Sequence, residues 1–365
     1  MSLEIEFLPV GEGSKAGDCI VVRYGMPGAY DLMIIDGGTT ETGVSLVAHI
    51  RKQFPEMAHI EHVVLTHADL DHASGLRELF GEFTIGCLWM HIPWTLAREV
   101  PHFFEGNPSA DTIEKEVRDC YNVLDEIVEL AGKHNVRVQM PFAQMSIGPF
   151  TVLSPSRDMY LKLLPQFDRT PDADDKALEA ADARLDEGKG FFSKALEALA
   201  AMVFEPWGVE TLRDGEATSA SNESSLVLYG LEGYRRYLLT GDAGIEALTF
   251  AADTADAMNL PLQQFDFVQV PHHGSRHNVG PTILDRVLGK AITQGSASRG
   301  SAYVSAPKDN SKHPKKVVMN AFTRRGFEVH ATQGSAKVFC GGFAARPGYH
   351  AATPMPFHNE VEAYD

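Results

Sequence analysis

Four side chains that can bind metal ions lie within six consecutive residues: His67, Asp69, Asp71 and His72. The apolar run 60–65 before them predicts a buried strand, and residues 73–80 predict the first turns of a helix. A loop between a strand and a helix can aim side chains at this spacing toward one point. Because unpaired buried charges are costly, packing gives no reason to gather them there. The segment predicts a metal site; the plainer alternative is a polar loop with an aspartate capping the helix.

A second group of such residues lies far downstream, again at predicted strand ends. Asp242 follows the predicted strand 234–239, and the pair His272 and His273 follows the predicted strand 265–270. A lone Asp after Gly is commonly a turn residue or a helix cap. Two adjacent histidines between a proline and a glycine are harder to explain by packing. His313, which precedes a proline at a predicted helix start, fits a cap or an exposed position equally well.

The elements around these loops follow the same order in both halves of the chain. Each half begins with predicted hairpins, over 5–35 and 225–239, and then alternates strands with helices. One long helix is predicted over 112–131 and another over 313–325, and a last strand at 336–340 closes the sheet. This order favours an α/β protein, a four-layer αββα sandwich of two sheets with helices outside. We expect one domain over residues 1–365, with the polar loops along one sheet edge.

The segment 154–207 differs in composition from the rest of the chain. It is polar and turn-rich at first, and residues 177–201 are rich in Ala, Leu, Glu and Lys. We interpret it as a helical insertion within the domain. Its composition does not decide whether it covers the site or forms a partner surface.

The composition of the chain limits the kinds of partner that we expect. The net charge of −17 disfavours indiscriminate nucleic-acid binding, although it does not exclude a nuclease. No apolar run approaches the roughly 20 residues that span a bilayer, and the N-terminus lacks a secretory pattern. Four widely spaced cysteines suit a reducing compartment. We therefore expect a cytoplasmic protein with no membrane partner.

Seven short motifs in order resemble the metallo-β-lactamase superfamily, and specifically the hydrolase domain of the ComEC/Rec2 competence proteins. They lie at residues 10–20, 35–38, 65–72, 222–228, 239–242, 270–275 and 312–314. The resemblance covers nearly the whole chain except the insertion. It implies the fold of that superfamily and a metal centre, often binuclear, at the sheet edge.

The resemblance also implies roles for individual residues. His67 and Asp69 would hold the first metal, Asp71 and His72 the second, and Asp242 would bridge the two. One histidine of the pair would complete the second site. Because adjacent residues on an extended strand face opposite ways, we favour His273 as the ligand, with His272 beside it or against the substrate.

Two departures from the family pattern concern the first metal. Asp69 stands where the family has a histidine, and oxygen-rich ligation moves preference from zinc toward manganese or magnesium. A middle histidine is also missing, and His91, at a predicted strand exit, is the best substitute. We expect two divalent ions, Zn²⁺ or Mn²⁺.

Such a centre would act through a metal-bound hydroxide. Asp71 would orient the water and accept its proton, and His272 or His313 would assist the leaving oxygen. The leading hypothesis is a hydrolase of phosphoesters, a nuclease or a phosphodiesterase acting on small or nucleotide-type substrates. One alternative is hydrolysis of a small thioester, lactone or β-lactam. Another is a non-catalytic regulatory or binding module that uses the metal structurally.

Overall fold

The computed structural model describes residues 2–12, 16–103, 108–167, 202–310 and 312–364. Two seven-stranded sheets form the centre of the molecule. The first sheet has the strand order β15-β1-β2-β3-β4-β5-β6. Its strands are β1 Ser2–Phe7, β2 Cys19–Met26, β3 Ala29–Gly37, β4 His59–Val64, β5 Thr84–Trp89, β6 Arg137–Gln139 and β15 Lys337–Gly341.

The second sheet is built from residues 146–331, with the order β14-β13-β12-β11-β10-β8-β7. Its strands are β7 Ser146–Ile147, β8 Phe150–Ser154, β10 Val227–Glu232, β11 Arg235–Leu239, β12 Phe267–Gln269, β13 Gly300–Val304 and β14 Phe327–Ala331. The strand β15, although last of these in sequence, pairs antiparallel with β1 in the first sheet.

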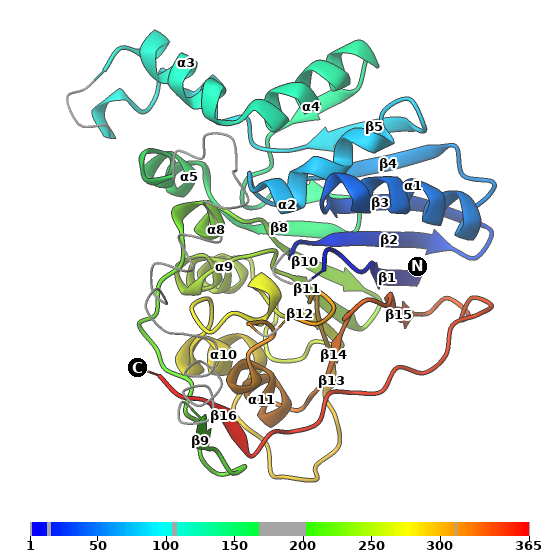
Figure 1. Ribbon diagram of the computed structural model, residues 1–365, viewed down its shortest axis with the longest axis vertical. Coiled ribbons are helices and arrows are strands. Elements are labelled where there is room, and N and C mark those ends of the chain that lie inside the picture. Colours follow the sequence, from blue (N-terminus) through cyan, green and yellow to red (C-terminus); the bar gives the residue numbers. More distant parts are fainter. Residues whose placement is uncertain (1, 13–15, 104–107, 168–201, 311, 365) are drawn as a thin grey trace, which may run out of the picture.

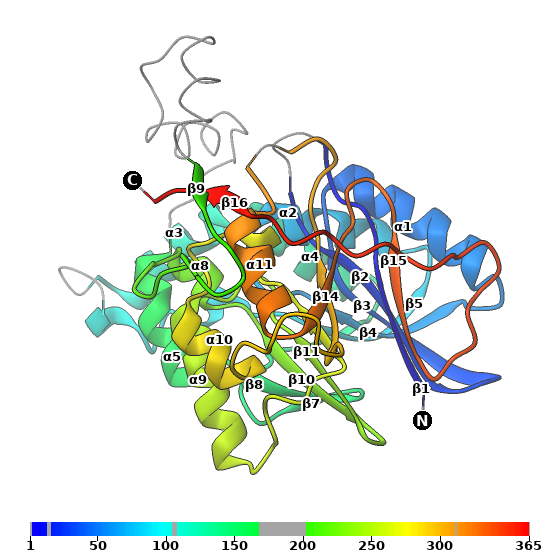
Figure 2. The same ribbon diagram turned by 90° about the horizontal axis from the view of Figure 1, so that it is seen from below.

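Helices cover the outer faces of both sheets. On the first sheet they are α1 Thr40–Gln53, α2 Leu70–Ala73, α3 Ala110–Cys120 and α4 Asn122–Lys133. On the second they are α8 Ala220–Glu223, α9 Ile245–Ala257, α10 Pro281–Leu288 and α11 Lys316–Arg324. Figure 1 shows these elements in sequence colours, and Figure 2 shows α1 on one side of the strands and α9, α10 and α11 on the other.

Three layers of buried apolar side chains hold this arrangement together. One lies between the first sheet and its helices and another between the second sheet and its helices. The third joins the inner faces of both sheets, where Phe7 contacts Phe267 and Tyr303. Alternating strand residues face this inner layer, as expected for half-buried strands. The predicted four-layer αββα fold is confirmed.

The prediction of one helix over 112–131 is wrong, because the helix is interrupted at Tyr121. Its backbone angles, φ −119° and ψ 51°, end α3 and precede α4. The break places the Tyr121 ring in the core, edge-on to Phe167. A buried aromatic contact therefore overrides the continuous helical pattern.

The predicted insertion 154–207 is described only at its two ends. The first end forms α5 Arg157–Leu163 and a short turn, and Tyr160, Leu163 and Phe167 are buried in the first core layer. At the other end, β9 Met202–Phe204 pairs with β16 Glu360–Glu362. Residues 168–201, on which the helical prediction mainly depends, lie outside the described residues.

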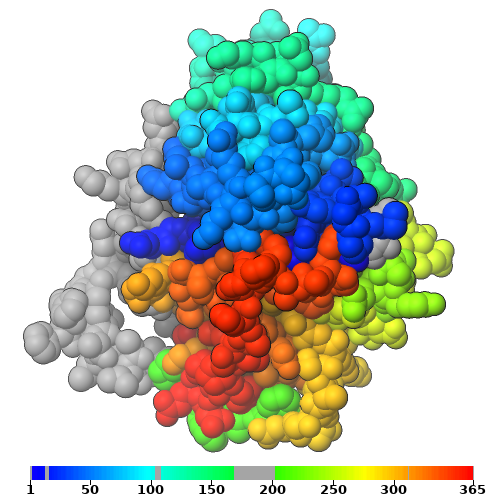
Figure 3. All heavy atoms as spheres, turned by 90° about the vertical axis from the view of Figure 1, so that its right-hand side faces the viewer, coloured from blue at the N-terminus to red at the C-terminus, as the bar shows by residue number. Residues whose placement is uncertain are grey.

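The C-terminal segment after β15 runs over both halves of the molecule. In Figure 3 it appears in orange and red between the blue first half and the yellow to orange second half. Arg346 forms ion pairs with the buried Glu4 and Glu6 of β1. At the far end, Glu362 accepts hydrogen bonds from the first backbone amides of α11. No helix among the described residues is long and apolar enough to span a membrane.

Candidate metal centre

The two predicted groups of ligands meet at one edge of the sandwich. The loop with His67 follows β4, the loop with Asp242 follows β11, and His272 and His273 follow β12. β11 and β12 are parallel neighbours in the second sheet and β4 lies in the first, and the loops that follow them meet at one edge of the sandwich. The backbone N–H of Leu226 donates to the Thr66 carbonyl at 3.1 Å and joins the two halves next to the site.

Two glycines permit the close approach of these loops. Gly17 has φ +142°, and a Cβ at this residue would lie 2.1 Å from the Asp71 carbonyl oxygen. Gly241 has φ +49°, and its Cβ would meet Thr66 at 3.1 Å. A side chain at either position would push a ligand-bearing loop away from the centre.

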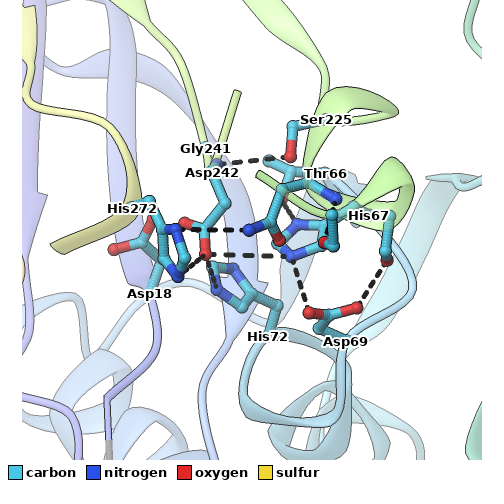
Figure 4. Close-up of polar contacts among 12 residues, drawn as sticks. Asp18, Thr66, His67, Asp69, His72, Ser225, Gly241, Asp242 and His272 are labelled. Atoms are coloured by element: carbon cyan, nitrogen blue, oxygen red, sulfur yellow. Dashed lines mark hydrogen bonds and ion pairs between the residues drawn. The ribbon is translucent and has the colours of Figure 1, made fainter. Parts of the chain in front are cut away.

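The carboxylate of Asp242 is the centre of the cluster (Figure 4). Four imidazole nitrogens face its Oδ2 atom. The distances from Nε2 are 3.4 Å for His72, 3.6 Å for His272, 3.6 Å for His273 and 3.9 Å for His67. These exceed a normal hydrogen bond, which is about 2.7–3.2 Å. They approach the separation of roughly 3.4 Å between two ligands of a tetrahedral ion with bonds of about 2.1 Å.

Further carboxylates extend the cluster. Ligand atoms of Asp71, His72 and His273 lie within 4.8 Å of one another, as do those of His67, His72 and Asp242. Asp18 and Asp36 form a third such group with His72. The described residues thus offer overlapping sets of ligands rather than one closed set of four.

Unpaired buried atoms indicate that a cation fits here. The atoms His67 Nε2, His72 Nε2, His273 Nε2 and Asp242 Oδ1 are buried and have no hydrogen-bond partner within the described structure. An unsatisfied buried polar group costs about 1–3 kcal/mol, so four together would be a large penalty without a ligand. Imidazole nitrogens and carboxylate oxygens are the donors that zinc and manganese accept.

Burial and charge set the protonation states of the cluster. Burial alone would raise the pKa of Asp242, but the imidazole of His72 holds it well below its usual range. Burial lowers the pKa of His273 to about 3, so at neutral pH its ring is neutral, the form that binds metal ions. Burial raises the pKa of Asp18 to about 7, against the opposing charge of His72.

Asp36 orients His72. Its Oδ2 lies 2.7 Å from His72 Nδ1, and its Oδ1 accepts the Thr66 N–H at 2.8 Å. The bond to Nδ1 leaves His72 Nε2 facing Asp242. A carboxylate behind a ligating histidine fixes the tautomer and ring orientation in many metal sites.

Asp69 lies beside the cluster with other partners. Its Oδ1 accepts a 2.5 Å hydrogen bond from Ser221, and its Oδ2 lies 3.6 Å from His67 Nε2. Its side chain is 41% exposed, the largest exposure among the candidate ligands in these ion pairs. Asp69 thus faces the solvent side of the centre.

The structure does not bring His91 to the cluster. Its Nε2 lies 2.6 Å from the Pro141 carbonyl, and its ring stacks on Tyr160 at 4.2 Å. Burial lowers the pKa of His91 to about 4. The groups of ligand-bearing side chains found among the described residues include none of His91, Asp69 and His272. Asp69 and His272 nevertheless face the cluster through His67 and Asp242, whereas His91 is a packed core residue.

His313 lies at the rim of the cluster. Its ring is nearly parallel to that of His272, with centroids 6.2 Å apart, and its buried Nδ1 has no hydrogen-bond partner among the described residues. Burial lowers the pKa of His313 to about 3, and His273 and His272 add to the effect. At neutral pH it can therefore donate a hydrogen bond but carries no positive charge.

Several residues that contact the centre were not predicted from the sequence. Asp18 and Asp36 lie within the motifs but were not expected at the site, although Asp36 directly precedes two glycines at a strand end. Asn278, Ser221 and Gln269 carry no local signal, because their contacts join residues far apart in sequence.

Comparison with known proteins agrees with this architecture. Residues 15–132, which include the first ligand cluster, match the family model of the metallo-beta-lactamase superfamily. No curated protein sequence matches the chain. By sequence, residues 15–132 thus match a metallo-β-lactamase superfamily domain, and the predicted enzyme class, a hydrolase of this fold, is confirmed.

Solved structures of this fold are similar over most of the chain. The metallo-beta-lactamase fold protein YhfI from Bacillus subtilis has a TM-score of 0.40 and 10% identity, covering 93% of this chain and 100% of that one. A diphosphatase of the PhnP family has a TM-score of 0.40 and 11% identity, and the match covers 93% of this chain and 98% of that one. Zn²⁺-bound PqqB from Methylobacterium extorquens has a TM-score of 0.42 and 11% identity, and the match covers 92% of this chain and 99% of that one.

Proposed function

We propose that the protein is a metal-dependent hydrolase of phosphoesters, of the phosphodiesterase or nuclease type, with two divalent ions, Zn²⁺ or Mn²⁺. The observation that carries the proposal is the buried Asp242 carboxylate, faced by four imidazole nitrogens without hydrogen bonds to it. The resemblance of the seven sequence motifs to those of ComEC/Rec2-type hydrolase domains supports a phosphoester substrate. When bound, the ions lower the pKa of water and hold the substrate oxygens.

The protein residues have distinct tasks in this reaction. His67, His72, His273 and Asp242 hold the ions, with Asp36 behind His72. Asp71, in the same cluster, orients the attacking water and accepts its proton. His313 donates a hydrogen bond to the leaving oxygen from the rim.

Solvent access supports catalysis over a purely structural metal. Asp69 is 41% exposed and the side chain of His272 is 30% exposed, so one side of the cluster is open to substrate and water. A structural metal site is usually closed by protein ligands, whereas a catalytic one keeps an open position.

The decisive experiment measures hydrolysis of bis-para-nitrophenyl phosphate with added Mn²⁺ or Zn²⁺. We expect Asp71→Ala and Asp242→Ala to lower kcat by at least about 100-fold, because they remove the proton acceptor and the central ligand. His277→Ala is the matched control, since His277 lies just beyond the histidine pair, is 50% exposed and pairs with Glu216.

The same assay separates the alternatives. Thioester, lactone and β-lactam substrates are tested in parallel, and turnover of one of these without phosphodiester turnover would replace the proposed substrate class. Unchanged phosphodiester activity in both aspartate variants would refute the proposed mechanism.

A further inference from the structure

The two adjacent histidines share an unusual backbone conformation. His272 has φ 45° and His273 has φ 54°, so two consecutive non-glycine residues are left-handed. Such residues cost of order 1–3 kcal/mol each and persist where the surroundings require them. In an extended strand the two rings would face opposite ways. Here both Nε2 atoms lie 3.6 Å from the same oxygen, Asp242 Oδ2.

Asn278 determines which nitrogen of His272 carries the proton. Asn278 Nδ2 donates to the backbone carbonyl of Asp242 at 2.8 Å, and a carbonyl can only accept. The other amide atom, Oδ1, therefore faces His272 Nδ1, at 2.8 Å. Nδ1 must donate to it. The amide nitrogen of Asn222 also approaches Nδ1, but at 3.2 Å, which is longer than the 2.8 Å contact with Asn278.

The opposite nitrogen of a neutral His272 then has a lone pair that faces an anion. His272 Nε2 and Asp242 Oδ2 would repel each other at 3.6 Å if nothing lay between them. A proton on Nε2 does not explain the distance, which is too long for a hydrogen bond. A cation that both atoms bind does explain it.

We propose that His272 is itself a metal ligand of this chain, through Nε2, with Asn278 as the residue that fixes its tautomer. His272 thereby adds an imidazole to a centre that lacks two expected ones. Asp69 stands where the family has a histidine, and His91 lies away from the cluster. This inference rests on the proposed metal-dependent function, but it concerns binding of the ion rather than the reaction.

The test measures Zn²⁺ binding to the whole protein by competition with a chelator, without substrate. His272→Ala should lose one ion or bind it at least roughly 100-fold more weakly, and Asn278→Ala should weaken binding roughly 10-fold or more. His277→Ala should bind as the wild type does. Circular dichroism establishes that each variant is folded.

Two spectroscopic measurements make the result specific. The visible absorption spectrum of the Co²⁺-loaded protein should change in His272→Ala, because one nitrogen donor is replaced. Long-range ¹H–¹⁵N correlation spectra of the Zn²⁺-loaded wild type should show His272 protonated at Nδ1 only. If His272→Ala retains the wild-type Zn²⁺ affinity and Co²⁺ spectrum, the inference is overturned.

The outcomes of the two proposals are distinguishable. Loss of metal affinity in His272→Ala, with no phosphodiester turnover by the wild type, would support the ligand and reject the proposed substrate. Unchanged metal affinity with a reduced kcat would reject the ligand, make His272 a contact for the substrate, and leave the hydrolase intact.

Discussion

Gln269 Nε2 donates a 2.6 Å hydrogen bond to Asp18 Oδ2 and so joins the second sheet to the first beside the metal centre. The other amide atom, Gln269 Oε1, accepts the backbone N–H groups of Thr240 at 2.9 Å and Gly241 at 3.1 Å. Gln269 is buried, at 3% exposure. One side chain therefore holds the loop that carries Asp242 against the half of the chain that carries His67 and His72.

Gln269→Leu should weaken metal binding without removing a ligand. The substitution keeps the volume but leaves two backbone N–H groups and one carboxylate unsatisfied, which costs about 1–3 kcal/mol each. We expect Zn²⁺ affinity to fall roughly 10- to 100-fold, as for other residues that position ligands. Chelator competition measures it. Gln264→Leu, which changes an exposed glutamine near the same strand, is the control, and equal affinities in the two variants would contradict the prediction.

Asp36→Asn should lower metal affinity through His72. The amide cannot serve as the anionic partner of Nδ1, so the ring loses its fixed orientation toward Asp242. We expect a loss of roughly 10- to 100-fold in Zn²⁺ affinity, with the number of bound ions at saturation unchanged. Isothermal titration calorimetry gives both quantities. The exposed Asp31, on the same strand, provides Asp31→Asn as the control. A wild-type affinity in Asp36→Asn would show that His72 does not need an anionic partner at Nδ1.

Local sequence patterns predict the layers of this fold well, because the hydrophobic pattern of each strand or helix indicates which of its faces is buried. The predicted strands 234–239 and 336–340 match β11 and β15 to within one residue at each end. The ligand loops were predictable for the same reason, since polar residues directly after buried strands need a function. Convergence of Asp242 with the early cluster followed from placing those strands in two packed sheets.

Long-range contacts explain what the sequence could not show. Tyr121 breaks a regular helical pattern to reach Phe167, and β15 crosses to the first sheet although its pattern fits either sheet. The left-handed turn at His272 has no local signal, because neither residue of the pair is a glycine. The contacts of His272 with Asn278 and Asp242 form only in the folded chain.

Glu223 should make stability depend on pH. Burial beneath the start of α9 raises the pKa of Glu223 to about 6 from 4.5, against the donation from the Ala247 N–H at 2.7 Å. Because the folded pKa is raised, the stabilisation is present below pH 4.5 and is lost as the pH rises through 6. The loss is about 2 kcal/mol at roughly 1.4 kcal/mol per pKa unit.

Urea unfolding between pH 4 and pH 7 tests this contribution against Glu223→Gln, which stays neutral throughout. We expect the free energy of unfolding of the wild type to fall by ~2 kcal/mol relative to the variant across this range. Glu246→Gln, an exposed change in the first turn of α9, removes a nearby charge that adds to the raised pKa of Glu223, so its free energy of unfolding should fall by slightly less than that of the wild type. A difference between wild type and Glu223→Gln that stays constant with pH would disprove the assignment.

Glu205 and Arg324 form an ion pair that is almost completely buried, with 0% and 1% of the side chains exposed. Their Oε1 and Nη1 atoms lie 2.6 Å apart, and Asn320 Nδ2 donates to the same oxygen at 3.0 Å. Arg324 also donates to the carbonyls of Trp207 and Pro206. The ion pair therefore holds the segment that follows β9 against α11.

Glu205→Ala should therefore lower the free energy of unfolding by about 3–5 kcal/mol, because it leaves a buried guanidinium without its counter-charge. Glu99→Ala is the matched control: Glu99 pairs with Arg157 at the surface, where both side chains are more than 40% exposed, and should cost at most about 1 kcal/mol. Replacing both partners, as in Glu205→Met with Arg324→Met, should recover much of the loss, since no isolated charge remains. Urea unfolding of the four proteins at pH 7 measures these differences. Equal costs for Glu205→Ala and Glu99→Ala would mean that water reaches Arg324 once its partner is removed.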